Sequence, residues 1–172
     1  SFKQFIFKNS YLLVAAAWLI TISFIIDNYW SDNSSVKAAE KNLAQYIHHQ
    51  EDDFDKLGND SALVKKIVSG KYDEPFLKEL TEKKYFFYVY QQNAMNEYNL
   101  KFWNTQVVTP SPQTLSNFDT SGYFQLSNGS YVWRKARCGE YALLCLIPVK
   151  WNYTITNEYL KNNFAAGNDI GD

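Results

Sequence analysis

The chain contains few cysteine, histidine and proline residues. Its 172 residues include two Cys, two His and four Pro. Two cysteines and two histidines are too few ligands for a zinc-finger scaffold. The seven glycines are too few for a collagen-like or low-complexity sequence. The formal net charge is −1 at pH 7 and the sequence has no long basic patch, so nucleic acid is not an expected partner.

The composition is that of one folded domain. Hydrophobic residues make up 46% of the chain and aromatic residues 17%, which is enough for a core. Charged residues make up 20%, a little below average but far from the composition of disordered proteins. The chain starts with Ser and not with Met, so we expect it to be processed or trimmed.

One apolar run predicts a membrane anchor. Residues 11–26 carry no charge, and residues 9–30 are long enough to cross a bilayer, at about 33 Å. Lys3 and Lys8 precede the run and Asp27 follows it, so the positive-inside rule places the rest of the chain outside the cytoplasm. The alternatives are a cleaved signal peptide, which is disfavoured because no small-x-small pair follows the run, and the buried helix of a soluble protein.

A long helix is predicted over residues 33–57, with Ser34 or Ser35 as its N-cap. Its apolar positions follow heptad-like spacings: they are Val36, Leu43, Ile47, Phe54 and Leu57. Two interpretations remain open. The helix forms a stalk that pairs with a second copy, or it covers the sheet of its own domain.

The rest of the chain is predicted to form short helices followed by strands. Short helices are predicted over residues 61–68, ended by Gly70, and over residues 76–83, opened by Pro75. β-rich runs predict strands over residues 85–90, 100–108, 123–126, 131–138 and 141–151. The last strand is nearly all apolar and should lie at the centre of the sheet, with Pro148 at its end or at a bulge. A closing helix is expected over residues 157–164.

The motif LIPVKWNY at residues 146–153, followed by NEYL at residues 157–160, resembles the outer sensor region of bacterial sensor histidine kinases. The order of helix and strands is likewise similar to that of PAS-like or Cache-like sensor domains. The resemblance implies an α+β fold with a five-stranded antiparallel sheet. The sequence patterns divide the chain into an anchor (1–30), a stalk helix (31–58), a PAS-like or Cache-like sensor domain (59–164) and a flexible tail (165–172). The resemblance also implies a second membrane span and kinase modules in the parent protein, neither of which this sequence contains.

The strand at residues 131–138 carries the candidate ligand site. Alternation places Tyr131, Trp133, Lys135 and Arg137 on one face of the sheet. Together with Asp119 and Tyr123 from the preceding loop and strand, these side chains predict a pocket in which Arg137 clamps a carboxylate. In the resembled family the ligand lies between the sheet and this loop. The alternative is an exposed, cross-strand-paired sheet face.

Three aromatic residues of the first two strands are interpreted differently. Tyr88, Tyr90 and Trp103 are expected to belong to the core or the sheet face, and not to contact a ligand.

Other polar residues point to no catalytic or metal site. His48 and Asp52, like His49 and Asp53, are four residues apart on a helix, which supplies two ligands at most and is typical of a solvated face. Motifs of nucleophile elbows, P-loops and metalloproteases are missing, so no enzymatic activity or cofactor is expected.

The two cysteines allow two interpretations. A two-residue turn at Gly139 and Glu140 would hold Cys138 and Cys145 about 13 Å apart as separate thiols. A longer loop between the two strands would instead permit a disulfide.

We therefore expect an extracytoplasmic sensor domain at the inner membrane that forms a homodimer and binds a small molecule. A single-span periplasmic accessory protein is the alternative, as is a pilin-like subunit, although the acidic residue that pilin-like chains carry early in the apolar helix is missing.

Overall fold

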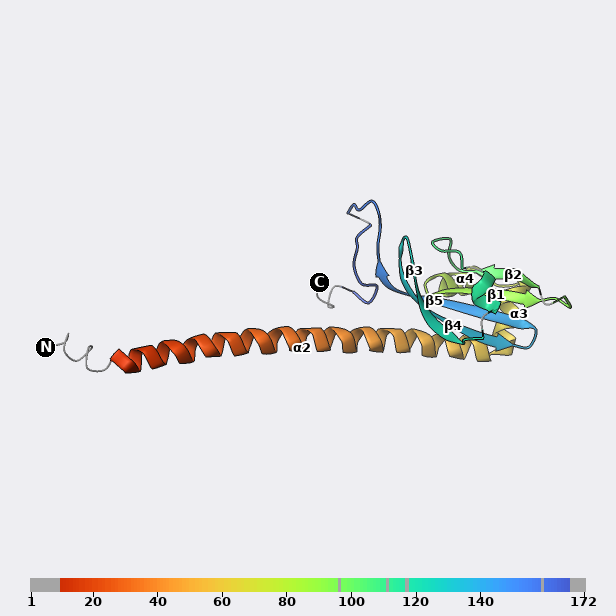
Figure 1. The fold of residues 1–172 in the computed structure, drawn as a ribbon. Helices are drawn as coiled ribbons and strands as arrows, with labels where there is room; N and C mark the ends of the chain where they lie inside the picture. The colour runs from red at the N-terminus through yellow and green to blue at the C-terminus, as the bar shows by residue number, and fades with distance from the viewer. Residues whose placement is uncertain (1–9, 96, 111, 117, 159, 168–172) are drawn as a thin grey trace.

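A single helix and a five-stranded sheet dominate the computed structural model, which describes residues 10–95, 97–110, 112–116, 118–158 and 160–167 (Figure 1). Helix α2 (Ser10–Asn59) is 50 residues long, or about 75 Å at 1.5 Å per residue. Its first part, Ser10–Asn28, is apolar enough and long enough to span a membrane. The expected cytoplasmic tip lies outside the described residues.

Helix α2 continues without a break where the sequence predicts a boundary. The prediction that a new helix starts at residue 33, capped by Ser34 or Ser35, is wrong because both residues are helical. Polar residues around residues 27–35 resemble a cap, but no Gly or Pro interrupts the chain before Gly58. Helix α2 ends at Asn59, two residues after the predicted end at residue 57.

Two short helices follow as predicted. Helix α3 (Ser61–Ser69) has Asp60 as its N-cap, whose side chain accepts a hydrogen bond from the Leu63 amide at 2.9 Å. It ends at Gly70, whose left-handed φ of 67° favours glycine. Helix α4 (Glu74–Thr81) has Pro75 in its first turn, where no intrahelical N–H is required.

The sheet is antiparallel throughout, in the order β2-β1-β5-β4-β3. Its strands are β1 (Phe86–Gln92), β2 (Tyr98–Trp103), β3 (Ser121–Leu126), β4 (Gly129–Cys138) and β5 (Tyr141–Trp151). The central position predicted for β5 is confirmed, and Pro148 lies beside the register shift between Ser130 and Tyr131. Strand β2 is shorter than predicted, and the short helix α5 (Pro112–Ser116) was not expected.

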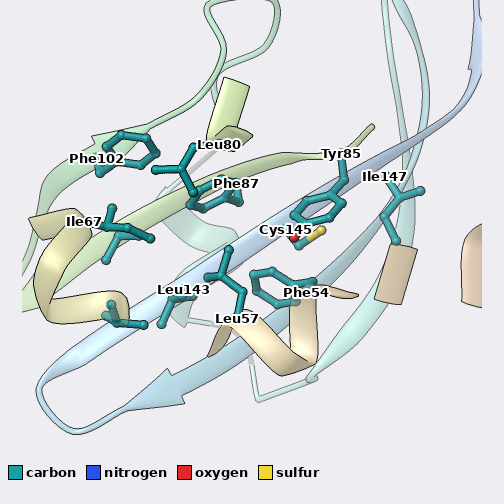
Figure 2. Close-up of a cluster of buried hydrophobic side chains, with 12 residues drawn as sticks. Phe54, Leu57, Ile67, Leu80, Tyr85, Phe87, Phe102, Leu143, Cys145 and Ile147 are labelled. Atoms are coloured by element: carbon teal, nitrogen blue, oxygen red, sulfur yellow. The ribbon is translucent and has the colours of Figure 1, made fainter. Parts of the chain in front are cut away.

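One face of the sheet is covered by α2, α3 and α4. Phe54 and Leu57 of α2 pack with Ile67, Phe87 and Leu143 in this helix-side core (Figure 2). The C-terminal part of α2 therefore covers its own sheet, as one of the two interpretations predicted. Val36, which lies nearer the N-terminus of α2, is 63% exposed and lies outside this core.

The opposite face carries a second cluster of buried side chains. These residues are Tyr88, Val108, Leu115, Tyr131, Trp133, Leu144 and Leu146. The segment between β2 and β3, which includes α5, supplies Val108 and Leu115 and thus covers this face. We call it the loop face of the sheet.

The predicted closing helix over residues 157–164 does not form. Instead, residues near Phe164 pair with the end of β5: the Trp151 amide donates to Asn163 O and the Ala165 amide to Val149 O, each at 2.9 Å. Strand β5 extends beyond Leu146, where its pairing with β1 ends, so this stretch has an open edge. The Asn157 amide also donates to Leu160 O at 3.0 Å, a backbone hydrogen bond that runs opposite to the helical direction and therefore competes with a helix. The expected flexible tail lies largely outside the described residues.

The contacts between α2 and β4 show how these elements and β5 run relative to one another. Glu51 and Asp55 of α2 contact Arg134, and Gly58 approaches Ala136 two residues further along β4. Helix α2 and β4 therefore run in the same direction. Strand β5, which is antiparallel to β4, returns toward the apolar part of α2 (Figure 1).

Candidate functional site

A hollow of about 230 Å³ opens on the loop face of the sheet. Its walls come from β2, the segment before β3, β4 and the start of β5. The lining residues are Tyr98, Leu115, Phe118, Asp119, Thr120, Lys135, Ala136, Arg137, Ala142 and Leu143. We call it the charged hollow, because Asp119, Lys135 and Arg137 meet there.

The sheet register positions the charged side chains. Arg137 of β4 lies opposite Ala142 of β5, whose small side chain leaves space above the sheet. The Arg137 guanidinium donates a hydrogen bond to the Tyr98 hydroxyl at 3.3 Å, which joins β4 to the far edge of the sheet. The Lys135 amide donates to Thr120 O at 2.7 Å, so the segment carrying Asp119 and Thr120 is held along β4.

The electrostatics of the charged hollow favour an anion with an organic part. Burial lowers the pKa of the Lys135 ammonium, and the neighbouring Asp119 carboxylate partly opposes this shift. The Lys135 Nζ also lies 5.4 Å from the centroid of the Trp133 ring. Two cations face one carboxylate in the hollow, and the rings of Tyr98 and Phe118 offer apolar contact beside them.

The structure brings together two of the five predicted ligand residues, Asp119 and Arg137. Tyr131 and Trp133 lie on the same face of the sheet but do not line the charged hollow; they are 0% and 7% exposed because α5 and the neighbouring strands cover them. Tyr123 pairs with Val132 and therefore lies on the opposite, helix-covered face.

Several lining residues were missed by the sequence prediction. Tyr98 comes from a strand three positions away in the sheet, and only the tertiary fold brings it close to Arg137. Phe118 and Thr120 flank Asp119 in the sequence, so proximity to that residue was the available signal. Lys135 was already on the predicted face.

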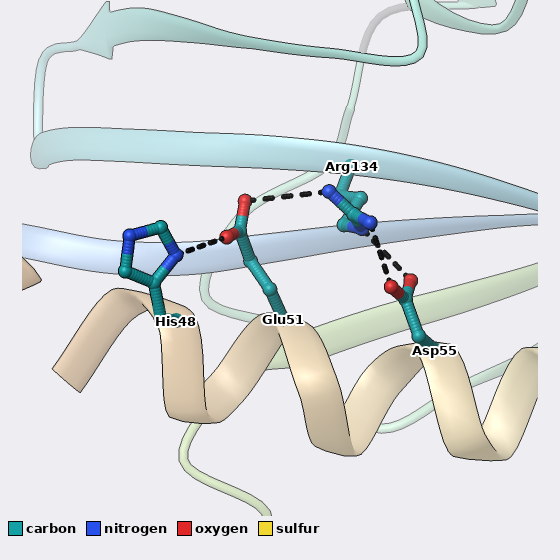
Figure 3. A network of polar contacts seen from close by, with 4 residues as sticks. All are labelled: His48, Glu51, Asp55 and Arg134. Carbon is teal, nitrogen blue, oxygen red and sulfur yellow. Dashed lines mark hydrogen bonds and ion pairs between the residues drawn. The ribbon is translucent and has the colours of Figure 1, made fainter. Parts of the chain in front are cut away.

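An ion-pair network on the opposite face fastens α2 to β4 (Figure 3). Arg134 donates from Nε and Nη2 to the two carboxylate oxygens of Asp55, at 2.8 and 2.6 Å. Its Nη1 lies 3.7 Å from Glu51, and Glu51 in turn contacts His48 Nδ1 at 3.1 Å. A bidentate pair of this kind fixes orientation as well as distance.

A second polar contact holds α2 to the start of the sheet. Asp53 accepts hydrogen bonds from Lys83 Nζ at 2.6 Å and from the Tyr85 hydroxyl at 2.8 Å. Partial burial raises the pKa of the Asp53 carboxyl, but these two hydrogen bonds outweigh it and leave the pKa below its ordinary value. Among the described residues, no group of three or more His, Cys, Asp or Glu side chains is placed to hold a metal ion.

The two cysteines are free thiols. The predicted two-residue turn is confirmed, since Cys138 lies opposite Tyr141 and Cys145 lies opposite Arg134. Cys145 is buried, and that burial raises the pKa of its thiol well above the ordinary value.

No family model, curated protein or solved structure matches this chain.

Proposed function

We propose that this chain is the extracytoplasmic sensor region of a membrane-bound sensor histidine kinase. The observation that carries the proposal is the continuity of α2. One helix includes both an apolar segment of membrane-spanning length and the residues Phe54 and Leu57, which are buried in the sheet domain. A displacement of the sheet domain against this helix is therefore transmitted along a rigid element.

The ligand that fits the charged hollow is a small organic carboxylate. Arg137 supplies a planar donor pair for the carboxylate, and Lys135 adds positive charge. Phe118 and Tyr98 supply apolar surface for the organic part of the ligand. A volume of about 230 Å³ is slightly below the range of typical ligand pockets, which favours a metabolite of few atoms.

Strand β4 connects the charged hollow to α2. Arg137 faces the hollow, whereas Arg134, three residues earlier, faces the opposite side and holds Asp55 of α2. A ligand that displaces β4 toward the hollow would change the Arg134–Asp55 geometry. The signal in this proposal is a small shift or rotation of α2 relative to the sheet.

The membrane orientation and the oligomeric state belong to the same proposal. Lys3 and Lys8 precede the apolar segment and support a cytoplasmic N-terminus with the sheet domain in the periplasm. Val36 is exposed and Leu43 half-buried on the part of α2 between the apolar segment and the sheet domain. These side chains would form the contact between two copies of the helix.

Ligand-induced stabilisation of the full chain in lipid nanodiscs tests the proposal. A panel of small mono- and dicarboxylates is screened for an increase in the unfolding temperature of the sheet domain. We expect at least one to stabilise the wild type, and Arg137→Ala to abolish that stabilisation because the bidentate donor is lost.

Lys101→Ala is the matched control, since Lys101 is an exposed cation of β2 that does not line the charged hollow. It should respond to the carboxylate as the wild type does. The proposed site would be contradicted if no carboxylate in the panel stabilised the wild type or Lys101→Ala. Stabilisation that persists in Arg137→Ala would contradict it as well.

A further inference from the structure

A second hollow, of about 300 Å³, lies on the same face of the sheet but at the β1–β2 end. The cross-strand pairs Tyr88–Trp103 and Tyr90–Leu100 form its floor. The chain that follows β2 forms its wall. The wall residues are Thr105, Gln106, Val108, Thr109 and Pro110. We call it the aromatic hollow.

The wall of the aromatic hollow is held in place by hydrogen bonds. The Tyr88 hydroxyl donates to Val108 O, and Asn128 Nδ2 from the β3–β4 turn donates to Val107 O at 3.1 Å. Within the wall, the Val107 amide donates to the Thr105 hydroxyl at 3.1 Å. Preformed walls reduce the conformational entropy that the protein would lose on binding a ligand.

The turn that follows β2 is fixed at its other end by Asn104. The Asn104 side chain accepts from the Phe87 amide at 2.8 Å and donates to Leu80 O and Tyr85 O at 3.0 and 3.1 Å. The wall therefore starts from an anchored residue and is pinned again at Val107 and Val108. Floor and wall belong to one rigid unit.

The aromatic hollow differs from the charged hollow in its chemistry. The residues that line it include no Asp, Glu, Lys, Arg or His. Its two tyrosines are neutral hydroxyl groups, because burial raises the pKa of both phenols. An ionic ligand would find no charged partner there.

The polar groups that remain are all uncharged. The hydroxyls of Thr105 and Thr109 donate and accept hydrogen bonds, and the Gln106 amide offers both roles at once. They stand beside the Trp103 ring, which is 49% exposed although it is a large aromatic side chain. The combination is an open aromatic face next to neutral donors and acceptors.

We propose that the aromatic hollow binds a neutral saccharide ring. A pyranose has an apolar C–H face that stacks on an aromatic ring, and hydroxyls around its edge that pair with neutral amides and hydroxyls. Trp103 and Tyr90 would supply the stacking surface, and Gln106 with the two threonines would supply the hydrogen bonds. A volume of about 300 Å³ suits one or two sugar units. The inference does not depend on the proposed sensor role.

Saccharide binding is measured on the full chain in phosphatidylcholine nanodiscs, because glycoside detergents would compete for the site. Neutral hexoses, N-acetylhexosamines and their disaccharides are titrated, with saturation-transfer NMR and tryptophan fluorescence as the readouts. We expect at least one to bind with a Kd of about 1 mM or tighter, as for a small ligand with few contacts.

Three variants assign the site. Trp103→Ala should weaken binding at least tenfold because the stacking surface is lost. Trp103→Phe should keep most of the affinity while the fluorescence change disappears. Gln106→Ala should weaken binding about fivefold, as expected for the loss of one hydrogen bond from an exposed side chain.

Tyr123→Ala is the matched control, because Tyr123 is an exposed aromatic residue of β3 that lines neither hollow. It should bind the saccharide as the wild type does. Absence of binding across the panel, or equal binding by Trp103→Ala and the wild type, would overturn the inference. Preference for an uronic acid that is lost in Arg137→Ala would also overturn it, by moving the sugar to the charged hollow.

Discussion

Arg134 is the residue through which β4 holds α2. Its guanidinium makes two hydrogen bonds to Asp55 and lies near Glu51, and all three side chains are about one third exposed or less. Exposed ion pairs contribute little because water screens the charges and long side chains lose entropy. This network differs in its bidentate geometry and its partial burial, so its removal leaves two carboxylates of α2 without their shared cation.

We therefore expect Arg134→Ala to lower the free energy of unfolding of the sheet domain by about 1.5 kcal/mol. Arg134→Lys should recover only part of this, since an ammonium keeps the charge but not the paired donors. Chemical denaturation followed by tryptophan fluorescence measures both. Lys78→Ala, which breaks an exposed pair with Glu82, is the control and should change stability by less than about 0.5 kcal/mol. Equal effects at the two positions would mean that the Arg134 network adds no more than an ordinary surface pair.

At the residue scale, alternation predicted which face a side chain takes but not whether that face is open. The placement of Tyr131, Trp133 and Arg137 on one side of β4 is confirmed. The burial of the first two residues depends on α5 and the segment before it, which carry no strong sequence pattern. The Arg137–Tyr98 contact joins residues 39 positions apart, so it required the tertiary fold.

At the scale of elements, α2 approaches β4 closely at Gly58. A Cβ atom added at Gly58 would lie 2.8 Å from the Cβ of Ala136, which is shorter than real carbon contacts. Gly58 therefore allows the end of α2 to lie against the sheet, where Phe54 and Leu57 enter the core. A glycine in a helix ordinarily costs about 1 kcal/mol relative to alanine, so its presence here indicates a packing role.

The consequence is that Gly58→Ala should destabilise the sheet domain by about 1 to 3 kcal/mol, although alanine is the better helix former. The reason is the clash with Ala136, which pushes α2 away from β4. Combining it with Ala136→Gly should recover much of the loss in a double-mutant cycle measured by chemical denaturation. An increase in stability for Gly58→Ala alone would show that helix and sheet separate at little cost.

The sequence predicted elements well where the pattern was strong. Strand β5 was predicted with its observed bounds because eleven residues, nearly all apolar, read as a buried central strand. The closing helix failed because the Asn157 amide bonds to Leu160 O, the Asn162 side chain accepts from the Tyr153 amide, and the open edge of β5 pairs with the residues around Phe164. The break expected near Ser34 failed because cap-forming residues do not end a helix that has no Gly or Pro.

At the scale of the whole molecule, the apolar segment and the sheet domain share one helix, so the side of the membrane on which the sheet lies follows from the orientation of α2. The two lysines before the apolar segment predict a cytoplasmic N-terminus. Ile155, in the chain after β5, is 78% exposed and suits a label on the sheet-domain side. Cys138 is half-buried and is therefore replaced by alanine. The remaining Cys145 is buried, so it should react little with the label.

In intact cells of a Gram-negative host, Ile155→Cys in the Cys138→Ala background should react with a maleimide that crosses the outer but not the inner membrane. Gln4→Cys in the same background should react only after the inner membrane is permeabilised, because the positive charge of Lys3 and Lys8 retains that end in the cytoplasm. Labelling is read from the mass shift of the purified chain, with Cys138→Ala alone as the baseline. The reverse pattern would place the sheet domain in the cytoplasm, and neither hollow would then face a periplasmic ligand. A third outcome is that osmotic shock releases the labelled Ile155→Cys chain from the membrane. The apolar segment would then not anchor the chain, and α2 would carry no signal across a bilayer.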